Sequence, residues 1–229
     1  MVFPFREEVY RFLQAFSGAP GGAVLDIGCG PGQYCGRFAS DGYQATGIDL
    51  DAAMIADAGK HYPGARFQCL DMRKLKADGG RFRCIFSIGN VMAHLPHRDL
   101  VPFIETVWAM LEPGGFWIMQ VMNWDALLEI PEYLFPVKSI PDGVYPLEFH
   151  RSYTSIHPES VIFTFSLLQA GVLLFTEEMT LYPVTSGDCL RFHEAAGFIC
   201  LGMFADFRRS ALSSEPGTGL VMVFRKESA

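Results

Sequence analysis

The sequence is poor in basic residues, in long apolar runs and in metal-binding patterns. It has 18 Lys and Arg against 25 Asp and Glu, a formal net charge of -7 at pH 7, and no basic run. Nucleic-acid binding needs clustered cations that displace counterions, so we expect no RNA or DNA partner. No apolar segment approaches the ~18–20 residues that cross a bilayer, so we expect no membrane association. The acidic pair Glu7 and Glu8 comes too early for a signal peptide.

The cysteines lack the spacing of metal ligands, because there is no Cys-x-x-Cys pair and no histidine cluster beside them. They are Cys29, Cys35, Cys69, Cys84, Cys189 and Cys200. We therefore expect no metal site, and reduced thiols in a cytoplasmic protein. The 229 residues are 50% hydrophobic and 14% aromatic, which is enough for one packed domain over residues 1–229.

The most informative stretch is the apolar run Ala23–Ile27 and the glycine-rich loop that follows it. The run predicts a buried parallel strand that carries one acid, Asp26, next to its last residue. Gly28, Gly30 and Gly32 then stand at alternate positions. Glycine lets the backbone turn sharply and lets a ligand lie against it. In α/β sheets, nucleotide-like ligands bind where a strand ends in such a turn. The alternative for this chain is a glycine-rich turn that binds no ligand.

Two common nucleotide-binding loops are excluded by the details. A dinucleotide fingerprint, Gly-x-Gly-x-x-Gly, would need glycine where Gln33 stands. A phosphate-binding loop would need a lysine after the last glycine, and there is none. An NAD-linked reductase is therefore disfavoured.

The remaining sequence alternates between strand and helix patterns. Strands are predicted at 23–27, 44–50, 66–72, 83–88, 116–122, 199–204 and 220–225, and helices at 6–16, 34–40, 100–111 and 187–196. Alternation of this kind predicts an α/β fold with a largely parallel sheet.

Acidic residues stand at the ends of two predicted strands. Asp49 lies roughly twenty residues past the glycine loop, where related folds place an acid on the ribose hydroxyls. The alternative is a cap for the helix that begins near Ala52, a role for which Asp51 is better placed. Asp71 could accept a hydrogen bond from an adenine amino group while Met72 offers an apolar face to the ring. The alternative for Asp71 is a loop acid in solvent.

Together these strand-end residues resemble the motifs of the class I S-adenosylmethionine-dependent methyltransferases. Asp26 with the glycine loop is similar to their first motif, and Leu111–Gly115 to the turn before their fifth strand. The resemblance implies a Rossmann-like seven-stranded sheet with helices on both faces, and S-adenosyl-L-methionine as cofactor, with S-adenosyl-L-homocysteine as product. It implies these cofactor contacts: Asp26, Gly28, Cys29, Gly30, Gly32, Asp49, Leu50, Asp71, Met72, Ile88 and His94.

A narrower resemblance lies in Gly89–Pro96 and in Asn123–Asp125, which are similar to two segments of the glycine and sarcosine N-methyltransferases and their small-molecule relatives. It implies that Asn90 and Asn123 contact the acceptor and that His94 borders the methionine part of the cofactor. The alternative for His94 is a surface or capping role. Val91 and Met92 depart from the pattern toward a more apolar pocket wall, so the identity of the amino-acid acceptor does not carry over.

Residues 123–186 do not fit the bare methyltransferase sheet. Strand patterns at 147–154, 160–168 and 172–182 predict an antiparallel β insertion after the fifth strand. Its place in the chain puts it over the carboxyl edge of the sheet, where it would cover the substrate. The alternatives are a stabilising flap and a dimer surface.

The sequence thus predicts methyl transfer to nitrogen or oxygen of a small-molecule acceptor. The alternative is a catalytically silent protein that binds S-adenosylmethionine or S-adenosylhomocysteine. Alignment of nucleophile, methyl and sulfur would supply most of the catalysis. His94, Glu148, His150 and Glu177 are candidate bases by position only, so no catalytic residue is assigned, and the oligomeric state stays open.

Overall fold

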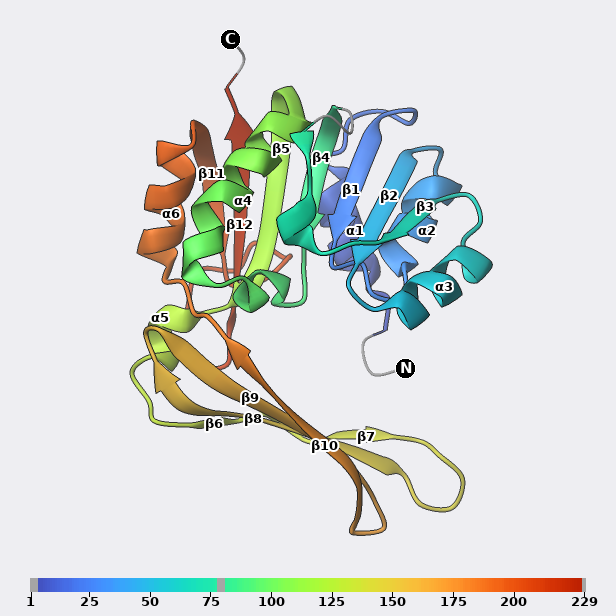
Figure 1. The fold of residues 1–229 in the computed structure, drawn as a ribbon, viewed down its shortest axis with the longest axis vertical. Helices are drawn as coiled ribbons and strands as arrows, with labels where there is room; N and C mark the ends of the chain where they lie inside the picture. The colour runs from blue at the N-terminus through green and yellow to red at the C-terminus, as the bar shows by residue number, and fades with distance from the viewer. Residues whose placement is uncertain (1–3, 78–80, 228–229) are drawn as a thin grey trace.

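Seven strands form one mixed sheet in the order β11-β12-β5-β4-β1-β2-β3, as the computed structural model in Figure 1 shows. The structure describes residues 4–77 and 81–227. The strands are β1 (Ala23–Ile27), β2 (Gln44–Asp49), β3 (Arg66–Cys69), β4 (Phe82–Ser87), β5 (Leu111–Met122), β11 (Phe198–Phe204) and β12 (Gly219–Lys226). β12 pairs antiparallel with both β5 and β11, and the other pairs are parallel. The predicted fold class is confirmed.

Helices cover both faces of this sheet. They are α1 (Glu7–Gln14), α2 (Gln33–Ser40), α3 (Ala52–His61), α4 (His97–Met110), the short α5 (Trp124–Leu127) and α6 (Ser186–Ala195), with 3-10 helices η1 (Met72–Lys74) and η3 (Val91–His94). α1 and α2 pack on one face, while α4 and α6 pack on the opposite face.

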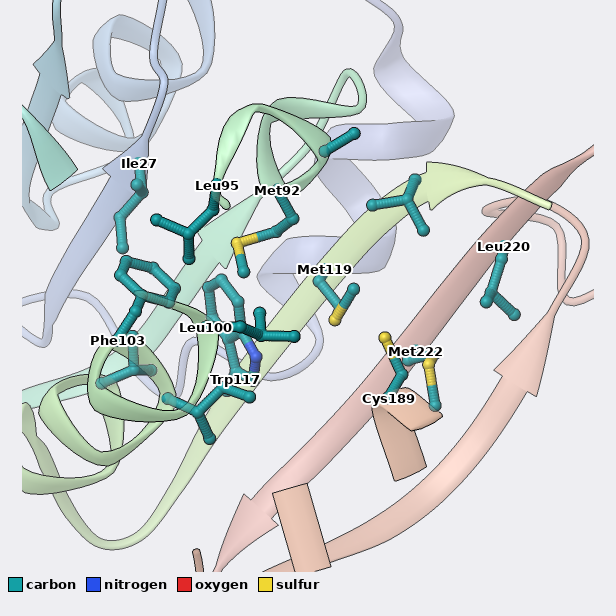
Figure 2. Packing of buried hydrophobic residues seen from close by; sticks show 14 of the residues in the cluster. Ile27, Met92, Leu95, Leu100, Phe103, Trp117, Met119, Cys189, Leu220 and Met222 are labelled. Carbon is teal, nitrogen blue, oxygen red and sulfur yellow. The ribbon is translucent and has the colours of Figure 1, made fainter. Parts of the chain in front are cut away.

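The burial of β1 on both faces explains why its sequence is a continuous apolar run. Its side chains alternate between two clusters, with Leu25 and Ile27 on the α4 side and Val24 on the α1 side. On the α4 side, Trp117 packs at the centre of the cluster and is fully buried. Figure 2 shows Leu100 and Phe103 of α4 lying over this ring.

The order of the strands creates a switch point between β1 and β4. From β1 the chain runs outward through β2 and β3, and then returns to β4 on the other side of β1. Loops that leave β1 and β4 therefore diverge, and the crevice between them is where open α/β sheets bind ligands. The hydroxyl of Ser87, at the end of β4, donates to the Ile27 carbonyl at 2.9 Å and holds the two strand ends together.

Several element boundaries differ from the predictions, and three of them lie near the site. β3 ends at Cys69, because the Asp71 carboxylate accepts from the Arg73 backbone nitrogen and starts η1. α4 begins at His97, three residues before its predicted start. β5 begins at Leu111, because this residue already pairs with Phe82 of β4.

The insertion after β5 forms a second sheet, in the order β10-β9-β8-β6, with β7 also paired to β8. Its strands are β6 (Tyr133–Leu134), β7 (Lys138–Ile140), β8 (Leu147–His157), β9 (Ser160–Gln169) and β10 (Val172–Leu181). All of its pairings are antiparallel, as predicted, but β6 and β7 were not predicted. In Figure 1 this sheet projects from the edge of the large sheet at which β5 leads into α5.

Candidate active site

The glycine-rich loop after β1 folds back across the end of β2. The backbone nitrogens of Gly28 and Cys29 donate to the Ile48 carbonyl at 2.8 and 2.9 Å. The nitrogen of Gly30 donates to the Asp49 carboxylate at 2.8 Å. The loop is therefore held by a strand and an acid, and its backbone is fixed before any ligand arrives.

Gly28 and Gly30 serve this loop in different ways, although both have positive φ. A Cβ atom on Gly28 would lie 2.5 Å from a methyl of Val91, so that glycine permits close packing. At Gly30 the nearest atom is the Met54 sulfur at 3.9 Å. Gly30 therefore borders open space in which a ligand can approach the backbone.

Asp49 and Asp51 divide two tasks at the end of β2. Asp51 caps α3, because its carboxylate accepts from the nitrogens of Ala53 and Met54 at 2.8 and 3.0 Å. The carboxylate oxygens of Asp49 each accept one backbone hydrogen bond, from Gly30 and from Asp51. A carboxylate has about four acceptor positions, so Asp49 retains capacity for two hydroxyl groups.

Asp26 is buried beneath the loop with an unsatisfied oxygen. Its residue is 1% exposed, and its Oδ1 has no hydrogen-bond partner. Burial, together with the charge of Asp49, raises the pKa of Asp26 to about 8. The same burial and the two acids raise the pKa of the Cys29 thiol, so this cysteine is a poor nucleophile at neutral pH.

Asn90 joins the end of β4 to the insertion. It adopts a left-handed backbone with φ of 67°. Its side-chain oxygen accepts from the Met122 nitrogen at 3.0 Å, and its side-chain nitrogen donates to the Tyr153 hydroxyl at 3.2 Å. The sequence interpretation missed Tyr153, although the alternating pattern of β8 places it on the buried face of that strand.

Comparisons with known proteins point to one family. Residues 24–115 match the family described as a methyltransferase domain. The S-adenosylmethionine-dependent methyltransferase of Clostridium acetobutylicum superimposes with a TM-score of 0.80 at 13% identity, covering 98% of this chain and 93% of that chain. The chain carries a methyltransferase domain in the class I S-adenosylmethionine-dependent methyltransferase fold.

Two further relatives differ in the acceptors that their names give. The ubiquinone biosynthesis O-methyltransferase of Nitrobacter winogradskyi is 35% identical over 126 residues, 53% of this chain and 48% of the relative. CalS10 of Micromonospora echinaspora, an amino pentose methyltransferase solved with S-adenosylmethionine, has a TM-score of 0.73 at 19% identity, covering 96% of this chain and 89% of that chain. The chain spans about half the length of the curated relatives it matches. The narrower resemblance to glycine and sarcosine N-methyltransferases stays a prediction.

At the next strand end of this methyltransferase fold, Asp71 is held by Arg73. Two guanidinium nitrogens donate to its carboxylate at 3.0 and 2.6 Å, and this contact lowers the pKa of Asp71. The side chain of Met72 lies beside Pro102 and Phe103, under α4.

Two other apolar residues flank this edge of the methyltransferase fold. Leu50 is 72% exposed, between two acids. Ile88, just after β4, is half-buried against the α1 side of the sheet. Leu50 therefore offers free apolar surface to a flat ring at this edge, whereas Met72 is half-buried and packs partly against α4.

His94 and Asn123 are two further predicted polar contacts. The exposed side chain of His94 ends η3, where desolvation lowers its pKa and the charge of Asp49 opposes that shift, so the ring is mainly neutral at pH 7. Asn123 is 6% exposed, and its side-chain nitrogen donates to the Ser213 carbonyl at 2.7 Å. This donor is committed to the segment before β12, and a contact between Asn123 and the acceptor stays a prediction.

The other candidate bases lie in the insertion, away from the sheet edge that carries the glycine loop and Asp49. His150 and Glu148 bond to each other at 3.1 Å. Alternation along β8 places both on the face opposite Tyr153. Glu177 is an exposed residue of β10. Of the four candidates, His94 is the one in η3, which follows β4 at the switch point of the sheet.

Proposed function

We propose that this chain transfers the methyl group of S-adenosylmethionine to a nitrogen or oxygen of a small-molecule acceptor. The observation that carries the proposal is the convergence of the glycine loop, Asp26, Asp49 and Asn90 at the switch point of the sheet. Similar proteins are named for both oxygen and amino-sugar acceptors, which supports the small-molecule class.

The residues present fit this cofactor. Gly30 borders open space, and Asp49 retains acceptor capacity for vicinal hydroxyls. The exposed side chain of Leu50 can lie against an adenine ring. The buried acid Asp26 lies beneath the loop with one oxygen that has no hydrogen-bond partner. When bound, S-adenosylmethionine supplies a methyl group on a positively charged sulfonium sulfur, which leaves as a neutral thioether.

The contribution of the protein is then mainly alignment. Asn90 is held from two sides, by Met122 and by Tyr153, so its amide is a fixed wall of the acceptor site. Fixed walls that hold an acceptor in line lower the barrier by restricting its motion. His94, neutral at pH 7, is placed to accept a proton from an acceptor hydroxyl, whereas an amine acceptor must arrive unprotonated.

The insertion over residues 123–186 is proposed as the substrate cover of a single domain that works in the cytoplasm. Two hydrogen bonds tie the insertion to η3 and to Asn90, the residue before η3. The Tyr182 nitrogen donates to the Ala93 carbonyl at 2.7 Å, and the Tyr153 hydroxyl meets Asn90. The cysteines are free thiols, which supports the proposed compartment. Within the described residues, no helix has the length and apolar character to cross a bilayer.

Calorimetric titration tests the cofactor assignment. We expect S-adenosylmethionine and S-adenosylhomocysteine to bind more tightly than NAD. Tighter binding of NAD would contradict the proposal. Release of S-adenosylhomocysteine with a panel of small amines and hydroxy compounds then separates an enzyme from a protein that only binds the cofactor.

A further inference from the structure

Arg151 lies in the middle of β8 between aromatic rings. Its guanidinium carbon is 4.6 Å from the ring centre of Phe135 and 5.6 Å from that of Phe149. One terminal nitrogen donates to the Pro136 carbonyl at 3.4 Å, while the buried Nε has no hydrogen-bond partner. Across residues 4–77 and 81–227, no carboxylate oxygen lies within 4.0 Å of this guanidinium.

A second cation shares this face of the insertion. Lys138 of β7 pairs with Phe149 in the register of the two strands, so its side chain is on the same face as Arg151. Burial lowers the pKa of both residues, and the charge of Arg151 lowers that of Lys138 further. Glu177 shares the face but is two strands away across Phe165 and is exposed. A buried guanidinium donor without a partner, as at Arg151 Nε, is unfavourable for folding alone, and an anion bound there would satisfy it.

The same face leads to the proposed site of methyl transfer. Tyr153 follows Arg151 by two residues on β8, and its hydroxyl contacts Asn90. Two residues of strand correspond to roughly 7 Å. The rings of Phe135 and Phe163 pack against Tyr153 at centroid distances of 4.9 and 5.3 Å, so aromatic side chains line this face between Arg151 and Asn90.

We propose that Arg151 binds the carboxylate of the methyl acceptor, which is a small aromatic acid. This inference rests on the proposed function and names its substrate class. A guanidinium presents its donors in a planar fork that matches a carboxylate. The surrounding rings match a flat apolar body. The nitrogen or oxygen to be methylated would then lie at the other end of the acceptor, near Asn90.

The test compares acids with their neutral amides. Protein loaded with S-adenosylhomocysteine is titrated with 3,4-dihydroxybenzoate and 3,4-dihydroxybenzamide, and with 4-aminobenzoate and 4-aminobenzamide. We expect at least one acid to bind about tenfold or more tightly than its amide, the scale of hydrogen bonds to a charged group. Release of S-adenosylhomocysteine from S-adenosylmethionine-loaded protein should show the same preference in kcat/KM.

Variants assign the preference to this residue. Arg151→Met should abolish the preference for the acid while leaving binding of the amide unchanged. Arg151→Lys, which keeps the charge without the fork, should retain part of it. Arg98→Gln removes an exposed cation on α4, with a side chain that is 82% exposed, and should change nothing. Melting temperatures identify any variant that fails to fold. If Arg151→Met fails to fold, the acid preference of Arg151→Lys is compared with that of the wild type instead.

Each outcome bears on one of the two proposals. Equal binding of acid and amide, binding of neither, or an acid preference that survives in a folded Arg151 variant would overturn the carboxylate site. Titration of S-adenosylhomocysteine into the protein is the separate check. If S-adenosylhomocysteine binds and the acids show no preference, the carboxylate site fails while the proposed function stands. If S-adenosylhomocysteine does not bind, the proposed function fails.

Discussion

The buried acid Asp26 makes a sharp prediction about stability and pH. In an unfolded chain an aspartate has a pKa of about 3.9. In the fold, burial and the charge of Asp49 raise this pKa to about 8. Between these values the folded state holds a proton that the unfolded state has released. Rising pH therefore favours unfolding, and the loss continues until pH passes the folded pKa.

The size of the effect follows from linkage. Each unit of pH in this window changes the free energy of unfolding by about 1.36 kcal/mol while Asp26 stays protonated. Between about pH 6.5 and about pH 8 the wild type should lose about 1.5 kcal/mol, because ionisation begins near the upper limit. His193, whose pKa burial lowers to about 4, stabilises the fold increasingly up to about pH 6.5 and then contributes no further change.

The substitution Asp26→Asn isolates the contribution of Asp26 to the pH dependence of the free energy of unfolding. The amide has nearly the same shape and no charge, so any packing or hydrogen-bond cost of the variant is independent of pH. Urea unfolding at several pH values should show the wild type losing about 1.5 kcal/mol relative to Asp26→Asn over the stated window. A difference between the two proteins that stays constant with pH would show that Asp26 is already ionised in the fold, and would refute the reasoning.

Three further predictions concern the site and its cover. Asp49→Ala should weaken S-adenosylhomocysteine binding by roughly 1–3 kcal/mol in calorimetry with the fold retained, and unchanged affinity would remove the ribose role. Gly32→Ala should lower the free energy of unfolding by about 1–3 kcal/mol, because φ is 77° and a Cβ atom would lie 2.6 Å from Phe67. Gly59→Ala, in α3 with nothing within 4 Å, is the control and should not destabilise; equal losses would contradict the packing argument. Shortening the turn at 169–171 should reduce acceptor turnover and spare cofactor binding, whereas full activity would argue against the cover.

The sequence alone was sufficient for features that depend on near neighbours in the chain. The apolar run Ala23–Ile27 and the glycines after it predict a strand and a ligand-binding turn, because strand burial and backbone freedom are local properties. The cap formed by Asp51 also follows from residues two and three positions away. The antiparallel insertion was predictable for the same reason, since its three long strands carry strong local patterns.

The tertiary structure decided what those elements bring together. Asn90 contacts Tyr153 across 63 positions of the chain, and the charge of Asp49 at the end of β2 acts on His94 in η3. The direction in which the Asn123 side chain points could not be predicted from the local sequence pattern either. Asn123 is tied to Ser213, 90 residues away. Such contacts depend on the strand order and on the packing of distant segments, which periodicity over a few residues does not contain. The aromatic setting of Arg151 likewise depends on the fold of the insertion, which brings Phe135 over its guanidinium.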